Sequence, residues 1–193
     1  MKQPRTLFPV FVAIAIASLL FGMARMEESA APAGRAELTK HGAREESSTA
    51  RLIIPVQGLT RGDLHDTWGD ARSEGRRHEG IDIMAPQGAP VVAVADGRIV
   101  KFFDSVRGGV TIYQFDQTER LVYYYAHLER RAPNLTEGDA VRQGEVIGYV
   151  GMSGNAPVPH LHFEIQRLTA ERRWWVADAL NPYPYLMTGL PPA

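Results

Sequence analysis

Cysteine is absent from this chain of 193 residues. Its absence excludes disulfide bonds and thiolate metal sites, so a transition metal would have to be held by histidine, aspartate or glutamate. An excess of charge of one sign is missing too, because 21 Lys and Arg residues balance 22 Asp and Glu residues, for a formal net charge of −1. Proteins that bind nucleic acid electrostatically normally carry a basic face, so we expect no nucleic-acid partner.

Long stretches with helical spacing of apolar residues are also missing after residue 51, where short strand-like runs alternate with turn signals. The predicted fold class is therefore all-β and antiparallel, in one domain over residues 51–193. The pair Asp96-Gly97 is a hairpin signal, because glycine accepts the positive φ that tight turns need. The predicted strand pairs are 89–95 with 98–103 across that turn, 110–115 with 121–126, and 141–144 with 145–150, and a further strand is predicted at 160–166.

One long hydrophobic run is present, at residues 7–23, and it follows the positive side chains of Lys2 and Arg5. Its length is at the short end of the roughly 17–25 residues that span a bilayer, and the preceding charges predict an exported remainder. Residues 1–24 are therefore interpreted as a helical membrane anchor, with a cleaved signal peptide as the alternative. Residues 25–50 are rich in Ala, Glu, Ser and Arg and are predicted to form a flexible tether.

Histidine and aspartate, the metal ligands that remain available, occur in a suggestive pattern. His160 and His162 lie two apart in a predicted strand, so their side chains project from the same face. Asp82 lies in the alternating run Ile81-Asp82-Ile83, and His78 precedes it by four residues. Two imidazoles and one carboxylate can hold Zn²⁺ and leave its fourth position open for water, which is the arrangement of catalytic zinc sites.

Two further histidines need an interpretation. His127 follows the predicted strand at 121–126, and beside a metal it could act as a general base or donate to developing negative charge. His65 lies outside the pattern and is interpreted as structural. Glu164 continues the face of His160 and His162, and either orients an imidazole or is simply exposed.

Three blocks of the sequence resemble the signature motifs of the lysostaphin/LytM-type zinc metallopeptidases, and the resemblance covers about residues 69–165. The glycines and the Asp96-Gly97 pair between the blocks also match that family. The three blocks are His78-x3-Asp82, Tyr125-Ala126-His127-Leu128 and Pro159-His160-Leu161-His162-Phe163-Glu164.

The resemblance implies specific roles for five residues. It implies that His78, Asp82 and His162 are the zinc ligands, and that His127 and His160 are catalytic histidines without a bond to the metal. The split of base and oxyanion roles between the two stays open. The implied fold is a compact, sandwich-like pair of antiparallel sheets with a narrow groove over the metal.

The resemblance also implies a function and a location. The expected activity is that of an exported zinc metalloendopeptidase, which hydrolyses amide bonds in the stem or cross-link peptides of peptidoglycan during cell wall remodelling. The expected location is the cell envelope, on the periplasmic side of the inner membrane or in the extracellular wall. The expected partners are peptidoglycan peptides and, through residues 1–24, the bacterial membrane; a regulatory protein partner stays open.

The sequence leaves several alternative functions open. The domain could be a non-catalytic peptidoglycan-binding regulator or activator of other wall hydrolases, but the complete ligand set argues against this. It could also be a wall-anchoring module, but no separate wall-binding repeat is visible in the sequence. The bond that is cut stays open between a cross-link from D-alanine to a diamino acid and a glycine bridge. The aromatic pair Trp174-Trp175 and the run Tyr183-Pro184-Tyr185 could form a binding platform, but packing of a closing segment onto the sheet is favoured.

Overall fold

The computed structural model describes residues 51–193. The predictions for residues 1–24 and 25–50 lie outside this part of the chain, so they stay predictions. No helix within residues 51–193 is long and apolar enough to cross a membrane.

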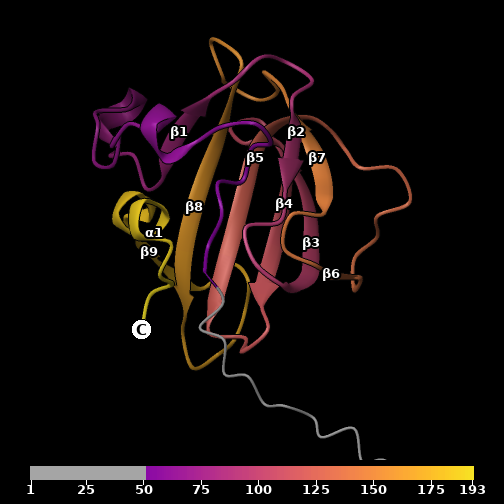
Figure 1. Ribbon diagram of the computed structural model, residues 1–193. Helices are drawn as coiled ribbons and strands as arrows, with labels where there is room; N and C mark the ends of the chain where they lie inside the picture. Colours follow the sequence, from indigo (N-terminus) through magenta and orange to yellow (C-terminus); the bar gives the residue numbers. More distant parts are fainter. Residues whose placement is uncertain (1–50) are drawn as a thin grey trace, which may run out of the picture. The chain divides into compact units, whose positions relative to one another are not determined.

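Nine antiparallel strands build the domain, which confirms the all-β prediction (Figure 1). The central path has the order β1-β8-β5-β4-β3-β6; β9 also pairs with β8, and β2 and β7 form a pair that joins β5. The strands are β1 (Ile81–Met84), β2 (Pro90–Val92), β3 (Gly97–Ser105), β4 (Gly109–Asp116), β5 (Leu121–Arg131), β6 (Ala140–Val141), β7 (Val146–Val150), β8 (His160–Leu168) and β9 (Ala177–Leu180).

The resemblance implied two separate sheets, but the strands form one connected sheet. The reason is that β5 pairs with β8 along one part of its length and with β7 along another. Its first part, Leu121 to Ala126, pairs with β8, and its last part, Leu128 to Arg131, pairs with β7. The register of β5 shifts between these two parts. A bulge of this kind bends a strand and increases its twist, so one long strand can serve two differently directed sets of neighbours.

Two of the three predicted strand pairs are wrong. β2 pairs with β7, and β3 pairs with β4 and β6, so Asp96-Gly97 joins strands that are not hydrogen-bonded neighbours. The segment around Gln143-Gly144 likewise connects β6 to β7 without pairing them. Asp96 instead accepts a hydrogen bond from the backbone of Gln143 at 2.7 Å, so the turn is held by a segment distant in sequence. The pair β4–β5 and the strand at 160–166 are confirmed.

The core lies on one face of the strands that carry the candidate site. In β1, Ile81 and Ile83 are buried while Asp82 is only partly buried, as the alternation predicts. In β8, Leu161 and Phe163 are fully buried, and His160 and His162, which alternate with them, point the other way. Each such apolar side chain stabilises the fold by about 1.5–3 kcal/mol when buried. The site residues therefore stand on a rigid sheet.

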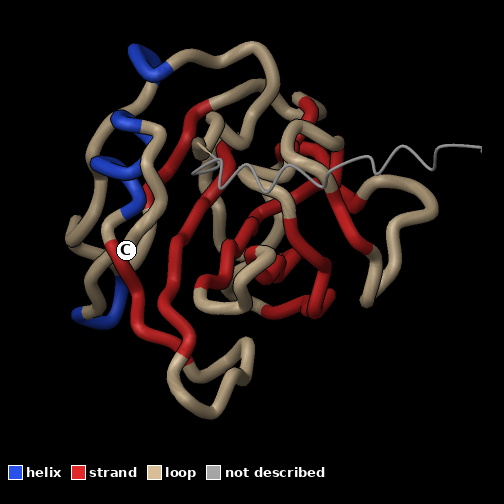
Figure 2. The backbone as a smooth tube through the Cα atoms, turned by 60° about the horizontal axis from the view of Figure 1, so that its bottom comes forward, coloured by secondary structure: helices blue, strands red, loops and turns tan. Residues whose placement is uncertain are grey.

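Short helical segments accompany the sheet, and they lie together on one side of it in Figure 2. They are the 3₁₀ turns η1 (Arg61–Asp63) and η2 (Ser73–Gly75) and the helix α1 (Pro182–Thr188). The side chain of Asn181 caps α1 by accepting from the backbone of Tyr183 at 2.9 Å, and Gly189 ends it with φ 76°. Leu186 anchors this helix in the core, with no exposed surface.

Candidate metal centre

Pairing of β1 with β8 brings two of the predicted ligands together. Asp82 lies directly opposite His162 in the antiparallel register. Because both side chains project from the face opposite the core, they meet above the sheet. His162 Nδ1 lies 3.2 Å from Asp82 Oδ1.

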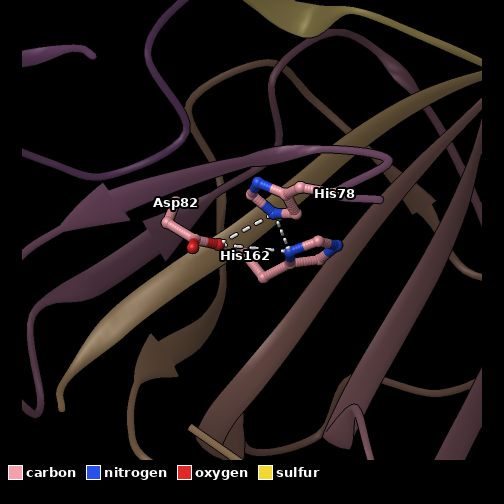
Figure 3. A group of neighbouring side chains, drawn as sticks. All are labelled: His78, Asp82 and His162. Carbon is pink, nitrogen blue, oxygen red and sulfur yellow. Dashed lines mark hydrogen bonds and ion pairs between the residues drawn. The ribbon is translucent and has the colours of Figure 1, made fainter. Parts of the chain in front are cut away.

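His78 reaches the same point from the loop before β1. Its Nε2 lies 3.1 Å from Asp82 Oδ1 and 2.8 Å from His162 Nδ1 (Figure 3). Gly80 permits this approach, because a Cβ atom there would stand 2.6 Å from the carbonyl oxygen of Phe163 and 2.9 Å from His162. A side chain at this position would push the loop away from β8, which explains why glycine occupies it.

The three side chains form the group within residues 51–193 that can hold a metal ion. Their ligand atoms are 2.8, 3.1 and 3.2 Å apart. This is slightly less than the roughly 3.3 Å between ligands on a tetrahedral Zn²⁺ with bonds of about 2.0–2.1 Å. One oxygen and two imidazole nitrogens at this spacing fit a zinc ion.

Hydrogen bonds on the far sides of both rings fix the atoms that face the site. His78 Nδ1 donates to the carbonyl oxygen of Thr67 at 2.7 Å, and His162 Nε2 donates to Glu164 Oε1 at 2.7 Å. Each ring therefore turns its other nitrogen to the centre, where that nitrogen offers a lone pair once it is unprotonated. Of the two roles left open for Glu164, the structure shows the orienting one.

A proton on His162 and a metal ion would compete for the same position at the centre. Burial alone would lower the pKa of His162, but hydrogen bonds to Asp82 and Glu164 outweigh it and raise that pKa to about 9. Burial also opposes ionisation of Asp82, yet hydrogen bonds from His162 and His78 hold its pKa far below the usual range. In the metal-free protein a proton on His162 therefore occupies the position that suits a cation.

Metal affinity should therefore depend on pH. A metal ion must displace the proton of His162, and below pH 9 each unit of increase raises the unprotonated fraction about tenfold. We expect the apparent dissociation constant for Zn²⁺, measured by competition with a chromogenic chelator, to fall about tenfold per unit between pH 6 and 8. Glu164→Gln should lower the pKa of His162, so that the zinc affinity of this variant stops increasing at a lower pH than that of the unsubstituted protein. A constant affinity from pH 6 to 8 in the unsubstituted protein would contradict the assignment.

Arg72 holds the other oxygen of the aspartate. Its Nη2 lies 2.6 Å from Asp82 Oδ2, so Oδ1 is left to face the two imidazoles. Sequence reasoning missed this contact, because nothing in the spacing from Arg72 to Asp82 distinguishes it from any other arginine in a loop.

The contact predicts a role for Arg72 in positioning the aspartate. Arg72→Gln should weaken zinc binding by about 10–100-fold, the usual effect of removing a group that orients a ligand. The measurement is a zinc titration at fixed pH, with the thermal midpoint recorded to verify folding. Arg142→Gln, which removes an exposed arginine outside the pocket, is the matched control and should leave the affinity unchanged.

A bulge in β5 directs His127 towards the centre, so this residue lies inside the strand and not at its end as predicted. The β4–β5 register advances by three residues on β5, from Tyr125 to Leu128, while it advances by two on β4. His127 adopts φ 59°, and its backbone N–H donates to the carbonyl oxygen of Gly108 at 2.8 Å. Bulges of this kind re-aim single side chains beside active sites.

The ring of His127 is held in one tautomer. Its Nδ1 donates to the carbonyl oxygen of Ser153 at 2.9 Å, which leaves Nε2 unprotonated. Burial lowers the pKa of His127 to about 4, although the hydrogen bond to Ser153 acts in the opposite direction. The ring is therefore neutral and able to accept a proton at neutral pH.

His160 lies beside His127, with ring centroids 4.9 Å apart. Its Nδ1 donates to the carbonyl oxygen of Val158 at 2.8 Å, and its Nε2 stands 3.5 Å from Asp82 Oδ1. All five residues proposed from the sequence therefore meet in one place. His65 is exposed and is not part of this group.

A pocket of about 430 Å³ contains these five residues. Its walls come from the loop before β1, the turn between β3 and β4, and the segment before β8. Four arginines also line the pocket, and the sequence analysis assigned them no role. For Arg76 and Arg77, their position directly before His78 could have indicated that they lie near the site. The four are Arg72, Arg76, Arg77 and Arg107.

The C-terminal aromatic residues mostly pack onto the domain, as favoured. Trp174 lies 4.6 Å from Tyr113 and 5.9 Å from Phe103, measured between ring centroids. Tyr183 and Tyr185 pack against the core. Trp175 is 59% exposed, so it is the member of the group that stays at the surface.

The chain is similar to several characterised proteins. It is 36% identical over 142 residues to the L-Ala--D-Glu endopeptidase of Bacillus subtilis (strain 168), across 69% of this chain and 42% of that protein. It is 48% identical over 93 residues to the DD-carboxypeptidase/endopeptidase Mpg of Neisseria meningitidis serogroup B (strain ATCC BAA-335 / MC58), across 46% of this chain and 20% of that protein. The chain thus spans less than half the length of these relatives.

The fold and the sequence pattern agree on the family. The catalytic domain of lysostaphin from Staphylococcus simulans superposes with a TM-score of 0.56 and 28% identity, over 65% of this chain and 94% of that domain. Residues 76–176, which contain all five site residues, match the family model described as peptidase family M23. The chain therefore belongs to peptidase family M23.

Proposed function

We propose that the protein is a zinc-dependent endopeptidase that hydrolyses amide bonds in peptidoglycan stem or cross-link peptides. The observation that carries this proposal is the meeting of His78, Asp82 and His162 with two further imidazoles in one pocket. Family membership supports hydrolysis of a peptide bond. The related proteins from Bacillus and Neisseria are endopeptidases by name, and the Bacillus enzyme is named for a bond between L-alanine and D-glutamate.

His78, Asp82 and His162 would hold the metal. When bound, Zn²⁺ supplies a Lewis acid that polarises an amide carbonyl and makes water more acidic. His127 then acts as the general base, because its Nε2 is unprotonated and the burial-lowered pKa keeps the ring neutral. His160, beside His127 and Asp82, is the residue we assign to stabilise negative charge on the carbonyl oxygen.

The location follows from the N-terminal segment of the sequence. We propose that residues 1–24 direct export, as an anchor or as a signal peptide, and that residues 25–50 tether the catalytic domain in the cell envelope. A non-catalytic regulator is the second candidate. No observation favours it, since the three proposed ligands are all present and both further histidines lie in the same pocket.

A profile of peptidoglycan fragments tests the proposal. Purified peptidoglycan is incubated with the zinc-loaded full chain, and the muropeptides are separated and weighed by mass spectrometry. We expect cross-linked dimers to decrease and monomers to increase, with product masses that identify the bond. The same incubation with His127→Ala, which retains the metal ligands, is the control. An unchanged profile with stoichiometric zinc in the protein would reject the proposed activity.

A further inference from the structure

The pocket is lined by more arginines than the one that pairs with a residue of the metal centre. Of its four arginines, Arg72 pairs with Asp82, and Arg77 donates through Nη1 to the carbonyl oxygen of Gly69 at 3.1 Å. Arg76 and Arg107 remain; Arg76 Nη2 donates to Ser73 Oγ at 3.2 Å, and within residues 51–193 neither arginine forms a hydrogen bond or ion pair with a residue of the metal centre. These two belong to different walls, since Arg76 precedes β1 and Arg107 lies in the turn between β3 and β4.

A single carboxylate oxygen lies between these two guanidinium groups. Oε2 of Glu74 is 2.5 Å from Arg107 Nη2 and 3.9 Å from Arg76 Nε. Glu74 belongs to η2, where it adopts φ 64° and ψ 28°. Glu74 does not itself line the pocket, and its carboxylate is bonded to Arg107 and stands close to Arg76 without a hydrogen bond. A carboxylate between two arginines in this way resembles the bound form of an external carboxylate.

The ion pair that holds Glu74 at this position is weak. Its side chain is 64% exposed and that of Arg107 is 60% exposed, and exposed ion pairs contribute little to stability. Arg76 Nε is buried and has no hydrogen-bond partner within residues 51–193, because 3.9 Å is beyond hydrogen-bonding distance. A buried N–H group without an acceptor is unfavourable, so a ligand that offers Arg76 Nε an oxygen atom would be favoured.

The backbone of Arg107 is fixed relative to His127. Its carbonyl oxygen accepts from the backbone of Asn155 at 3.0 Å, and the carbonyl oxygen of the next residue, Gly108, accepts from His127 at 2.8 Å. The turn that carries Arg107 is therefore tied both to the bulge of β5 and to the segment before β8. A carboxylate bound there would hold a peptide at a defined distance from the reacting bond.

We propose that Arg76 and Arg107 form a carboxylate-binding subsite for the peptide substrate, and that Glu74 occupies it until a substrate carboxylate replaces it. This inference rests on the proposed function and names the substrate class. Peptides with free carboxylates, such as the stem peptides of a directly cross-linked wall, are selected over uncharged peptides such as glycine bridges. Glu74 acts as a competitor inside the protein and lowers the affinity for substrates that carry a carboxylate at this position.

Calorimetric titration of the zinc-loaded full chain tests the subsite apart from hydrolysis. The probes are a monomeric muropeptide with free carboxylates and the same compound after conversion of its carboxylates to carboxamides. We expect the carboxamide form to bind about tenfold more weakly, as loss of a charge-assisted contact predicts. Arg107→Gln and Arg76→Gln should reduce that difference to less than about threefold, whereas Glu74→Gln should tighten binding of the carboxylate form.

Two controls make the test specific. Arg142→Gln, which removes an exposed arginine outside the pocket, should preserve the tenfold preference. Sodium acetate should compete with the muropeptide more strongly than sodium chloride of the same ionic strength, since a general effect of salt would not distinguish the two.

The outcomes separate this inference from the proposed function. Equal binding of the two probes, no binding of either, or a preference that survives both arginine substitutions would overturn the subsite, even if peptidoglycan is hydrolysed. A preference that depends on the arginines without any hydrolysis of peptidoglycan would support the subsite and reject the endopeptidase assignment. Thermal midpoints of all variants, compared with the unsubstituted protein, verify that binding differences do not arise from unfolding.

Discussion

Replacing His162 by alanine is expected to abolish stoichiometric zinc binding and to reduce hydrolysis of peptidoglycan by about three orders of magnitude or more. Nδ1 of His162 lies 2.8 Å from His78 Nε2 and 3.2 Å from Asp82 Oδ1, so it faces the same point as the two other proposed ligands. Its removal leaves one imidazole and one carboxylate, which are too few ligands for tight zinc binding.

The measurement combines metal content with activity. Zinc per protein is determined by elemental analysis after dialysis, and hydrolysis is followed by the muropeptide profile. His65→Ala is the matched control, because His65 is exposed and lies outside the metal group. If His162→Ala protein stripped of zinc kept full hydrolytic activity, both the metal centre and the proposed mechanism would have to be abandoned.

The second large effect is expected at His127, where alanine should lower kcat by about 10²–10⁴-fold without loss of zinc. The reason is that Nε2 of His127 is the unprotonated atom available to accept a proton, while the residue is not in the group that can hold the metal and meets His162 only through the edge of its ring, at 5.8 Å between centroids. This variant therefore separates proton transfer from metal binding, which the His162 substitution cannot do.

Both kinetic constants and zinc content are needed for the His127→Ala variant. A fall in kcat with an unchanged KM and one zinc per protein would support the role of general base. Loss of zinc together with activity would instead assign His127 a structural role at the centre. Retention of full activity would pass the role of general base to His160, the other unligated imidazole in the pocket.

The site could be predicted from the sequence because its signals are local. Alternation in the segments at 81–83 and 160–162 separates core residues from ligands, and β1 and β8 follow it. The resemblance supplied the roles of His127 and His160, which no spacing rule could assign. The two wrong strand pairs show the limit of local signals, since Asp96-Gly97 favours a tight turn but does not choose the partners of the strands beside it.

Other features could not be predicted because they depend on contacts between distant segments. The bulge that aims His127 exists because β5 pairs with β8 along one part and with β7 along another. The pairing of Arg107 with Glu74 joins the turn between β3 and β4 to the loop before β1. Neither residue belongs to a motif, so nothing in the sequence distinguishes these charges from ordinary surface charges.

The amino-acid sequence limits the atoms that can bind a metal, since it contains no cysteine and places His78, Asp82, His160 and His162 in two short motifs. That these two motifs meet depends on the folded domain. His78 and His162 are 84 positions apart and come within 2.8 Å because the core faces of β1 and β8 fix the register between the two strands. Chemistry of single residues is encoded locally, whereas distances between them depend on burial and strand pairing across the whole domain.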